Sequence, residues 1–197
     1  MTYRAPPTST ADRARETEAL IREQGTDTAR WAEMQNLATQ WDSRAAMAAE
    51  WIPAGSRVLD IGAGAMTLGT LLAPGCTYQP ADVVARDERC FVVDLNRGEF
   101  PPGTYDVITF LGVLEYVHDA QRTLRLAHAA APAMVVTYCG QTGLEVESRR
   151  GLGWVNDYDD AAFRALLADA GWSVEAHREV KRGPSNIQRM YRCVRTA

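Results

Sequence analysis

The sequence predicts an α/β protein in which helices cover both faces of a mostly parallel sheet. Short apolar segments alternate along the chain with longer amphipathic stretches, and this alternation is typical of parallel sheets. The 197 residues are 46% hydrophobic and 23% charged, which is ordinary globular composition and sufficient for one core. Collagen-like, low-complexity and disulfide-stapled folds are therefore excluded.

Charge, cysteine spacing and hydropathy narrow the class of protein. The formal net charge of -4 argues against a dedicated nucleic-acid binder. The four cysteines lack a metal-ligand spacing, so we expect no metal site and buried thiols in a reducing compartment. Residues 1–7 contain no apolar leader, and no segment has the length of a membrane span. We therefore expect a cytoplasmic protein without a membrane partner.

The N-terminal quarter is predicted to form an arm and one helix. Residues 1–30 are charged and hold few large apolar side chains, which predicts a flexible or helical arm, disordered over 1–10 and a solvated helix over 11–24. From Thr28 to Trp51, apolar residues recur at steps of three and four, which predicts an amphipathic helix ended by Pro53. Residues 31–197 are expected to form a single domain.

The later elements follow from runs of apolar residues and from their breakers. We expect strands over 57–61, 77–79, 91–93, 105–110, 133–138, 173–177 and 188–194, and helices over 66–72, 113–131 and 159–170. Pro132 ends the second of these helices and Gly171 the third. The connections 79–90 and 94–105 leave little room for crossover helices, so one face there is expected to be thinly covered, in part by Thr28–Trp51 or the arm.

A glycine turn follows the first predicted strand. Residues 58–65 read Val-Leu-Asp-Ile-Gly-Ala-Gly-Ala, and Gly62 and Gly64 allow the backbone to turn sharply beside a ligand. Dinucleotide-binding folds carry a third glycine where Thr67 stands, and the carboxylate of Asp60 would repel a pyrophosphate. A nicotinamide oxidoreductase is therefore disfavoured. An acid here suits a cofactor with ammonium and sulfonium charges.

Acidic residues stand at the ends of three successive predicted strands. Asp60 ends the first strand, Asp82 follows 22 residues later, and Asp94 ends the third strand. An acid at the second strand end can accept both hydroxyls of a ribose; Asp87 is the rival for that role, and Asp82 alone could be a turn residue. Asp94 can accept from an adenine amino group or belong to a strand-end turn. The three acids form a row at the edge where such folds bind ligands.

At these residues the sequence resembles the class I S-adenosylmethionine-dependent methyltransferases, over roughly residues 40–195. The resemblance rests on Val58–Gly64, Asp82, Val93–Leu95, Tyr105–Ile108, Leu114–Val117 and Ala170–Trp172. It implies a Rossmann-like sheet of seven strands with the last antiparallel. It also implies S-adenosyl-L-methionine as the cofactor.

The resemblance implies a role for each residue of the motif. The glycine turn would hold the methionine end of the cofactor through Asp60, Gly62, Ala63 and Gly64. Asp82 would hold the ribose, and Asp94 with the backbone of Leu95 would read the adenine. Leu111, in the segment 110–112, would line the methyl-donor side. The sequence departs from the family at Met66, where a third glycine is usual.

Three residues after the fourth predicted strand are the catalytic candidates: Glu115, Tyr116 and His118. Many small-molecule members of the family have a Glu-His pair here, but Tyr116 occupies the histidine position, so the catalytic histidine does not carry over. His118 can serve as a base, because an unperturbed imidazole has a pKa of about 6.5, or it can simply precede a helix. Tyr116 is expected to shape the pocket.

The loop-rich segment 138–158 is the expected place of acceptor recognition. Trp154 can stack on a ring and Arg149 can pair with an anionic group, or the segment can be a solvated loop with one aromatic anchor. Trp41 can cover the cofactor or belong to the core. The basic run 178–195 is interpreted as the solvent-exposed face of a strand rather than as a nucleic-acid surface.

These features together predict S-adenosylmethionine-dependent methyl transfer to an oxygen or nitrogen atom of a small-molecule acceptor. The chain lacks the Asn-Pro-Pro-Tyr and Pro-Cys strings of nucleic-acid methyltransferases, which favours a small acceptor. The alternative is a non-catalytic module of the same fold that binds the cofactor or a partner. The oligomeric state stays open.

Overall fold

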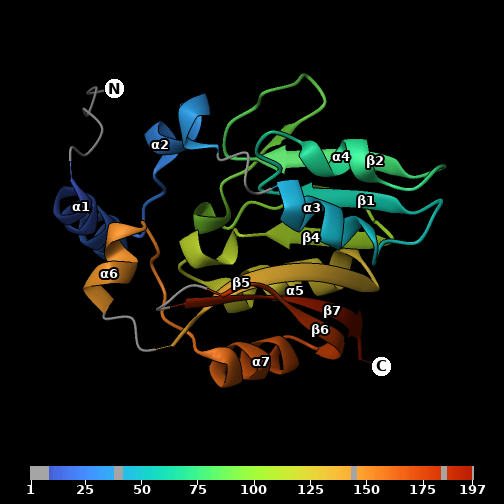
Figure 1. Ribbon diagram of the computed structural model, residues 1–197. Coiled ribbons are helices and arrows are strands. Elements are labelled where there is room, and N and C mark those ends of the chain that lie inside the picture. Colours follow the sequence, from blue (N-terminus) through green and yellow to red (C-terminus); the bar gives the residue numbers. More distant parts are fainter. Residues whose placement is uncertain (1–8, 38–41, 143–145, 183–185, 197) are drawn as a thin grey trace.

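The computed structural model describes residues 9–37, 42–142, 146–182 and 186–196, around one seven-stranded sheet (Figure 1). The strand order is β3-β2-β1-β4-β5-β7-β6. The strands are β1 (Arg57–Ile61), β2 (Thr77–Asp82), β3 (Phe91–Val92), β4 (Val107–Leu111), β5 (Ala133–Gln141), β6 (Trp172–Arg182) and β7 (Asn186–Arg195). β7 runs antiparallel to β5 and β6, and the other neighbouring pairs are parallel. The predicted Rossmann-like sheet is confirmed.

Helices lie on both faces of this sheet and beyond one of its edges. They are α1 (Thr10–Glu23), α2 (Thr28–Ala32), α3 (Asp42–Ala49), α4 (Thr67–Leu71), α5 (Ala120–Ala130), α6 (Val146–Gly151) and α7 (Asp160–Asp169). Short 3₁₀ turns are η1 (Met34–Asn36), η3 (Leu95–Arg97) and η4 (Leu114–Tyr116). No helix within the described ranges is long and apolar enough to cross a membrane.

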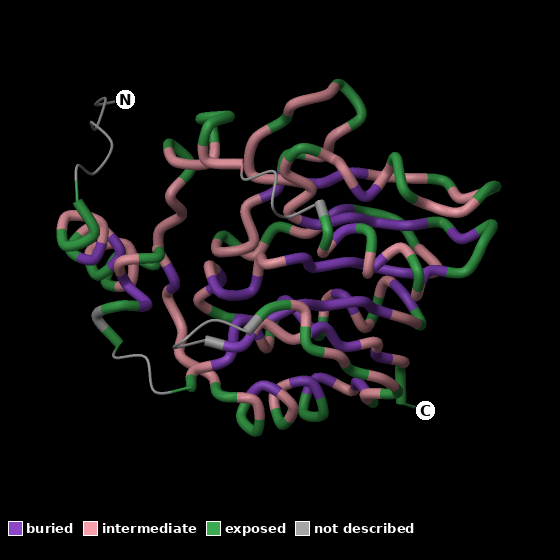
Figure 2. The backbone as a smooth tube through the Cα atoms, viewed as in Figure 1, coloured by how far each residue is buried: buried purple, intermediate pink, exposed green. Residues whose placement is uncertain are grey.

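Alternate residues of the central strands point into two apolar layers. Leu59 and Ile108 belong to the layer that packs against α5 and α7. Val58 and Val107 belong to the opposite layer, which α3 and α4 cover. This two-residue period places every second side chain of a strand on the same face. The central strands β1, β4 and β5 are consequently buried along most of their length (Figure 2).

The prediction of one helix over Thr28–Trp51 is wrong. α2 ends at Ala32, Glu33 is extended with φ -84° and ψ 115°, and a new helix, α3, begins only at residue 42. The side chain of Asn36 donates to the carbonyl of Arg30 at 2.8 Å, which folds the chain back onto α2. Trp41 lies outside the described residues. The apolar residues do recur at steps of three and four, but some line a cavity and others pack on the sheet.

The helix expected over 113–131 begins later, at Ala120. Asp119 caps it by accepting a hydrogen bond from the backbone N–H of Arg122 at 2.9 Å. The segment before the cap is a turn that contains η4. Residues 113–118 are thereby left free to form loop structure at the end of β4. The two final strands are longer than predicted and form a hairpin.

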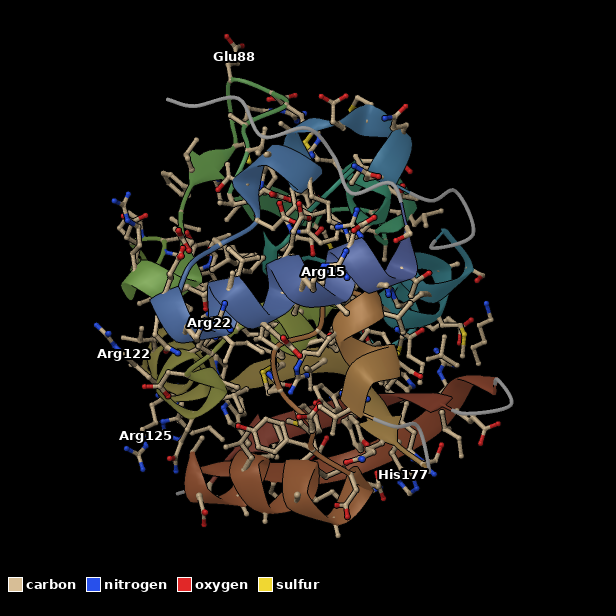
Figure 3. All side chains as sticks on the ribbon, turned by 90° about the vertical axis from the view of Figure 1, so that its left-hand side faces the viewer. Arg15, Arg22, Glu88, Arg122, Arg125 and His177 are labelled. Atoms are coloured by element: carbon tan, nitrogen blue, oxygen red, sulfur yellow. The ribbon has the colours of Figure 1, made fainter. Side chains whose placement is uncertain are left out.

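The arm packs against the domain. Ala14 and Thr17 of α1 are buried, and the Thr17 hydroxyl lies 2.8 Å from the carbonyl of Arg150 in α6. α1 and α6 lie side by side beyond the carboxyl edge of the sheet, and Figure 3 looks onto them with Arg15 and Arg22 labelled on α1. Helix α1 is therefore not solvated on all sides. Residues 1–8 lie outside the described part, and the division of the chain at residue 30 stays a prediction.

The two short connections contain no α-helix, as their lengths predict. The residues between β2 and β3 form bends and turns, and those between β3 and β4 contain only η3. The chain after α1 lies against both connections: Thr26 bonds to Asp94, and the carbonyl of Trp31 accepts from Arg86. The arm and α2 therefore lie against the connections at the carboxyl ends of β2 and β3, and their covering of a sheet face stays a prediction.

Candidate functional site

A cavity of about 280 Å³ lies at the carboxyl edge of β1, β2 and β4. β1 and β4 are the neighbours at which the strand order reverses, the usual ligand site of open α/β sheets. Its wall comes from the turn after β1, the ends of β2 and β3, the turn after β4, and the arm with α3. The lining includes Thr26, Trp31, Leu37, Arg44, Asp60, Gly62, Ala63, Gly64, Asp82, Arg86, Asp94, Leu95, Asn96, Leu111, Gly112, Val113 and Tyr116.

The turn after β1 forms the floor of this cavity. Gly62 and Gly64 have positive φ angles of 73° and 53°, a conformation that favours glycine. The backbone N–H groups of Gly62 and Ala63 both donate to the carbonyl of Ala81, at 2.8 and 3.1 Å. A Cβ atom on Gly62 would overlap Cγ2 of Val113. The turn thus needs glycine at position 62 for its conformation and for its close packing.

Met66 takes the place of the third family glycine without changing the course of this turn. Its φ of 59° is left-handed, so the backbone adopts the conformation that glycine would adopt there. This conformation costs a residue with a side chain about 1–2 kcal/mol. Ala65 and Thr67 line the cavity on either side, whereas the Met66 side chain does not belong to the described wall. The substitution therefore leaves the cavity open.

Asp60 is a buried carboxylate in the cavity wall. The hydroxyl of Thr109 donates to Oδ1 at 2.6 Å, and the hydroxyl of Tyr78 donates to Oδ2 at 2.7 Å. Burial raises the pKa of Asp60 to about 6, and the two hydrogen bonds oppose that rise. Each oxygen keeps a second lone pair for a ligand. Asp60 is therefore a negative group whose charge changes near neutral pH.

Asp82 stands at the end of β2 and is oriented by three groups. Its Oδ2 accepts from the backbone N–H of Gly64 at 2.8 Å and lies 3.6 Å from the guanidinium of Arg86. Its Oδ1 accepts from the N–H of Val84 at 3.2 Å. The rival, Asp87, bonds to Arg89 and does not belong to the described wall. Of these two acids, the structure brings Asp82 to the described wall of the cavity.

Asp94 combines both of the interpretations left open by the sequence. It caps η3, since its Oδ1 accepts from the N–H of Asn96 at 3.0 Å. It also lines the cavity together with Leu95. A strand-end turn and a ligand contact are therefore compatible at this residue.

Aromatic and cationic side chains form the remaining wall near the end of β4. The rings of Trp31 and Tyr116 meet edge to face, with centroids 4.9 Å apart. The guanidinium of Arg30 lies over both rings, 4.7 and 5.6 Å from their centroids. Arg44 of α3 packs over Gly112, where a Cβ atom would overlap its guanidinium. This side of the cavity presents two aromatic rings beside a positive charge.

Two of the three catalytic candidates lie behind the wall. Nε2 of His118 is 2.9 Å from the carbonyl of Gly25, which can only accept, so this nitrogen carries a proton. Glu115 is buried, its Oε1 accepts from the N–H of Cys139 at 2.8 Å, and burial raises its pKa. Only Tyr116 belongs to the described lining.

The sequence left two interpretations of Arg149 open, an acceptor contact and a solvated loop, and the structure places its side chain in neither setting. Its side chain is fully buried and donates to the carbonyls of Cys139 and Asn156 and to the carboxylate of Asp157. Trp154 is also buried, under this guanidinium, 4.7 Å away, and its Nε1–H donates to the hydroxyl of Tyr116. Neither side chain is part of the described wall. The described part of the segment 138–158 is packed rather than solvated, because its polar groups form hydrogen bonds with one another, and Trp154 in it supports Tyr116.

Several cavity residues gave no usable signal in the sequence. Trp31 and Leu37 were read as one apolar helix face, although they line the cavity. Thr26, Arg44 and Arg86 lie far apart in the chain and belong to no motif. Their chemistry becomes visible only when the fold brings them beside the acidic row.

The fold and this site define a Rossmann-like methyltransferase: a switch-point cavity, a glycine turn and three acids at strand ends. Residues 30–177 match a family described as a methyltransferase domain. The chain therefore belongs to this family and is a methyltransferase. No curated protein matches the sequence.

Solved structures share this fold at low sequence identity. Mitomycin 7-O-methyltransferase has a TM-score of 0.64 and 20% identity, and the match covers 91% of this chain but only 60% of that one. The Burkholderia thailandensis 1,6-didemethyltoxoflavin-N1-methyltransferase, with bound S-adenosylhomocysteine, has a TM-score of 0.62 and 16% identity over 100% and 93% of the two chains. The magnesium protoporphyrin IX methyltransferase of Synechocystis PCC 6803 has a TM-score of 0.61 and 17% identity over 91% and 100%.

Proposed function

We propose that this enzyme methylates an oxygen or nitrogen atom of a small-molecule acceptor in the cytoplasm. The observation that carries this proposal is the cavity, which joins an acidic row to the aromatic wall of Trp31 and Tyr116. The similar structures include one named for a 7-O and one for an N1 transfer, which supports both atom types. The four free cysteines suit a reducing compartment.

The residues of the cavity fit S-adenosylmethionine from one end to the other. The methionine end is a zwitterion, and Asp60 with Arg44 supplies one group of each sign for its ammonium and carboxylate. Gly62, Ala63 and Gly64 allow the backbone to approach this end closely.

The nucleoside end meets the two other acids. Asp82 accepts the ribose hydroxyls, and Asp94 with the backbone of Leu95 reads the adenine. Leu111 lines the side from which the methyl group leaves. When bound, the cofactor supplies a methyl carbon whose bond to sulfur breaks as the acceptor's lone pair bonds to it.

The protein contributes orientation and exclusion of water rather than a base. Among the described residues, the cavity wall includes no histidine, glutamate, lysine or cysteine, and its three aspartates, Asp60, Asp82 and Asp94, are assigned to the cofactor in this proposal. Tyr116 positions the acceptor through its ring, and His118 and Glu115 hold the turn behind it. The acceptor must therefore be nucleophilic by itself near pH 7, as a neutral aromatic amine, a phenolate or a carboxylate is.

A nucleic-acid acceptor is disfavoured by the arrangement of the C-terminal arginines. Arg178 pairs with Glu50 and Arg192 pairs with Glu175. These pairs neutralise two of the six basic residues of the run 178–195, and the chain as a whole is acidic with a net charge of -4.

An acceptor panel tests the proposal directly. We expect the purified enzyme to methylate phenols acidic enough to ionise near pH 7 or heteroaromatic amines, with one equivalent of S-adenosylhomocysteine formed for each methylated product detected by mass spectrometry. Aliphatic alcohols, which need a base, are expected to stay unmodified. Turnover with aliphatic alcohols alone would contradict the base-free mechanism. Binding of S-adenosylhomocysteine without any transfer would favour the non-catalytic module.

The raised pKa of Asp60 predicts that cofactor binding weakens in acid. Only the ionised carboxylate attracts an ammonium group, and Asp60 ionises at about pH 6. We expect the affinity for S-adenosylhomocysteine, measured by calorimetry, to fall about tenfold for each pH unit below 6. Asp60→Asn, which keeps the shape, is expected to bind weakly at every pH and to lose this slope.

The stability of the unliganded protein is a control, because its pH dependence has the opposite sign to that of cofactor binding. Folding raises this pKa from 3.8 to about 6, so the stability that Asp60 contributes is fully present below pH 3.8 and is lost as the pH rises through 6. Asp60→Asn is expected to remove this loss from the urea-unfolding profile. An unchanged pH slope in both assays would show that Asp60 does not titrate in this range.

A further inference from the structure

The turn between α1 and α2 reaches the acid that faces the adenine. The hydroxyl of Thr26 donates to Oδ1 of Asp94 at 2.7 Å. The same hydroxyl oxygen accepts from Nδ2 of Asn96 at 2.9 Å. All three residues line the cavity. A residue of the arm is thus bonded directly into the nucleoside end of the site.

These bonds decide which oxygen of Asp94 is left for a ligand. Thr26 and the backbone N–H of Asn96 both donate to Oδ1. In the described part of the chain, no donor is bonded to Oδ2. A carboxylate that is anchored through one oxygen presents the other in a fixed direction, and an anchored acceptor discriminates between ligands better than a rotating one.

The turn that carries Thr26 is itself held in place. Nε2 of His118 donates to the carbonyl of Gly25 at 2.9 Å, and the N–H of His118 donates to Oδ1 of Asn96 at 2.9 Å. Nδ2 of Asn96 also reaches the carbonyl of Tyr116, at 3.1 Å. The arm, the segment after β3 and the segment after β4 are joined in one network. His118, which the sequence suggested as a base, here holds the turn of Thr26 to the segment after β3 by these two hydrogen bonds.

We propose that Thr26 is a positioning residue that makes the site selective for a 6-amino purine. Thr26 fixes Asp94 so that Oδ2 accepts from the 6-amino group of adenine and repels the oxygen of a 6-oxo purine. This proposal rests on the proposed binding of adenine by Asp94. It assigns the arm a part in cofactor recognition in addition to its packing on α6.

The test compares two ligands that differ only in the base. Calorimetry gives the Kd of S-adenosylhomocysteine and of S-inosylhomocysteine, in which hypoxanthine replaces adenine. We expect the wild type to prefer the adenine ligand by about 100-fold, since a site built for a donor rejects an analogue that lacks it. Thr26→Val keeps the shape without the hydroxyl, and we expect it to lower this preference about tenfold.

Matched variants separate positioning from a structural effect. Thr26→Ser retains the hydroxyl and is expected to keep the wild-type preference. Thr70→Val removes a hydroxyl that bonds within α4, to the carbonyl of Thr67, and is expected to keep the preference too. A loss of packing would weaken both ligands alike and leave the ratio of the two Kd values unchanged.

The outcomes also distinguish this inference from the proposed function. An unchanged ratio in Thr26→Val, or a wild type that binds both ligands equally, overturns the role of Thr26 while methyl transfer stands. A wild type that binds S-adenosylhomocysteine but methylates no acceptor overturns the proposed function and leaves the role of Thr26 intact. A lowered ratio in Thr26→Val, with serine restoring it, supports the proposal.

Discussion

Replacing Asp82 with alanine is expected to weaken S-adenosylhomocysteine binding by at least about 100-fold, because each charge-assisted hydrogen bond to the ribose contributes about 1.5–3 kcal/mol. The change also removes the acceptor of the Gly64 N–H and the partner of Arg86. The floor of the cavity then keeps its bonds from Gly62 and Ala63 to the carbonyl of Ala81 in β2 but loses the one from Gly64. Calorimetric titration at pH 7.5 measures the effect, at a pH where Asp60 is ionised.

Asp87→Ala is the matched control for this prediction. Asp87 is a carboxylate only five residues away, but it bonds to the exposed Arg89 and does not belong to the described wall. We expect its removal to change the Kd less than twofold. If Asp82→Ala bound within threefold of the wild type while staying folded, the ribose would have to lie elsewhere.

The parts of the site that the sequence predicted are those in which one local feature sets the structure. Gly62 and Gly64 stand in a turn that needs positive φ angles, and the strand before them is apolar except for Arg57 at its exposed start and Asp60. Parallel strands then bring their carboxyl ends to one edge, so that Asp60, Asp82 and Asp94 meet although they are far apart in the chain. No long-range packing had to be known for this step.

The N-terminal part could not be predicted because its apolar residues serve different surfaces. Trp31 lines the cavity, whereas Ala48 packs on the sheet, and both fit a period of three or four. Periodicity reports that residues are buried and not what buries them. The contact of Thr26 with Asp94 joins residues 68 positions apart, and nothing local to either residue encodes it.

The start of α5 was predictable in principle. Asp119 is a strong N-cap residue, and its carboxylate accepts from the N–H of Arg122. The apolar residues from Val113 onward suggested an earlier start, because Leu114 and Val117 are buried. They are buried in the apolar layer that packs against α5 and α7, although they lie in a turn before the helix. Capping chemistry was the better guide than hydropathy at this boundary.

Arg149 shows how a charged residue in a loop can be structural. Its guanidinium has no exposed surface and bonds to backbone carbonyls of β5 and of the loop after α6. Asp157 also pairs with Arg150, at 2.5 Å. A buried charge is tolerated only when its hydrogen-bonding groups are satisfied. The network therefore ties α6, on which α1 packs, to the central sheet.

Arg149→Met is expected to lower the free energy of unfolding by about 3 kcal/mol or more, because it leaves two carbonyls and part of a carboxylate unsatisfied. Urea unfolding measures this change. Arg57→Met is the control, since Arg57 is 55% exposed and pairs with Asp106 at 3.4 Å, and we expect a loss of less than about 1 kcal/mol.

The same variant distinguishes support from acceptor binding. A residue that binds an anionic acceptor would raise KM and leave unfolding unchanged, since its charge would face an open cavity. A buried support lowers stability and changes KM only through the position of Tyr116, which Trp154 contacts beneath the guanidinium. Normal stability of Arg149→Met with a raised KM would return Arg149 to the acceptor site. Because its side chain is fully buried, we expect Arg149→Met to lower the stability of the protein rather than to raise KM alone.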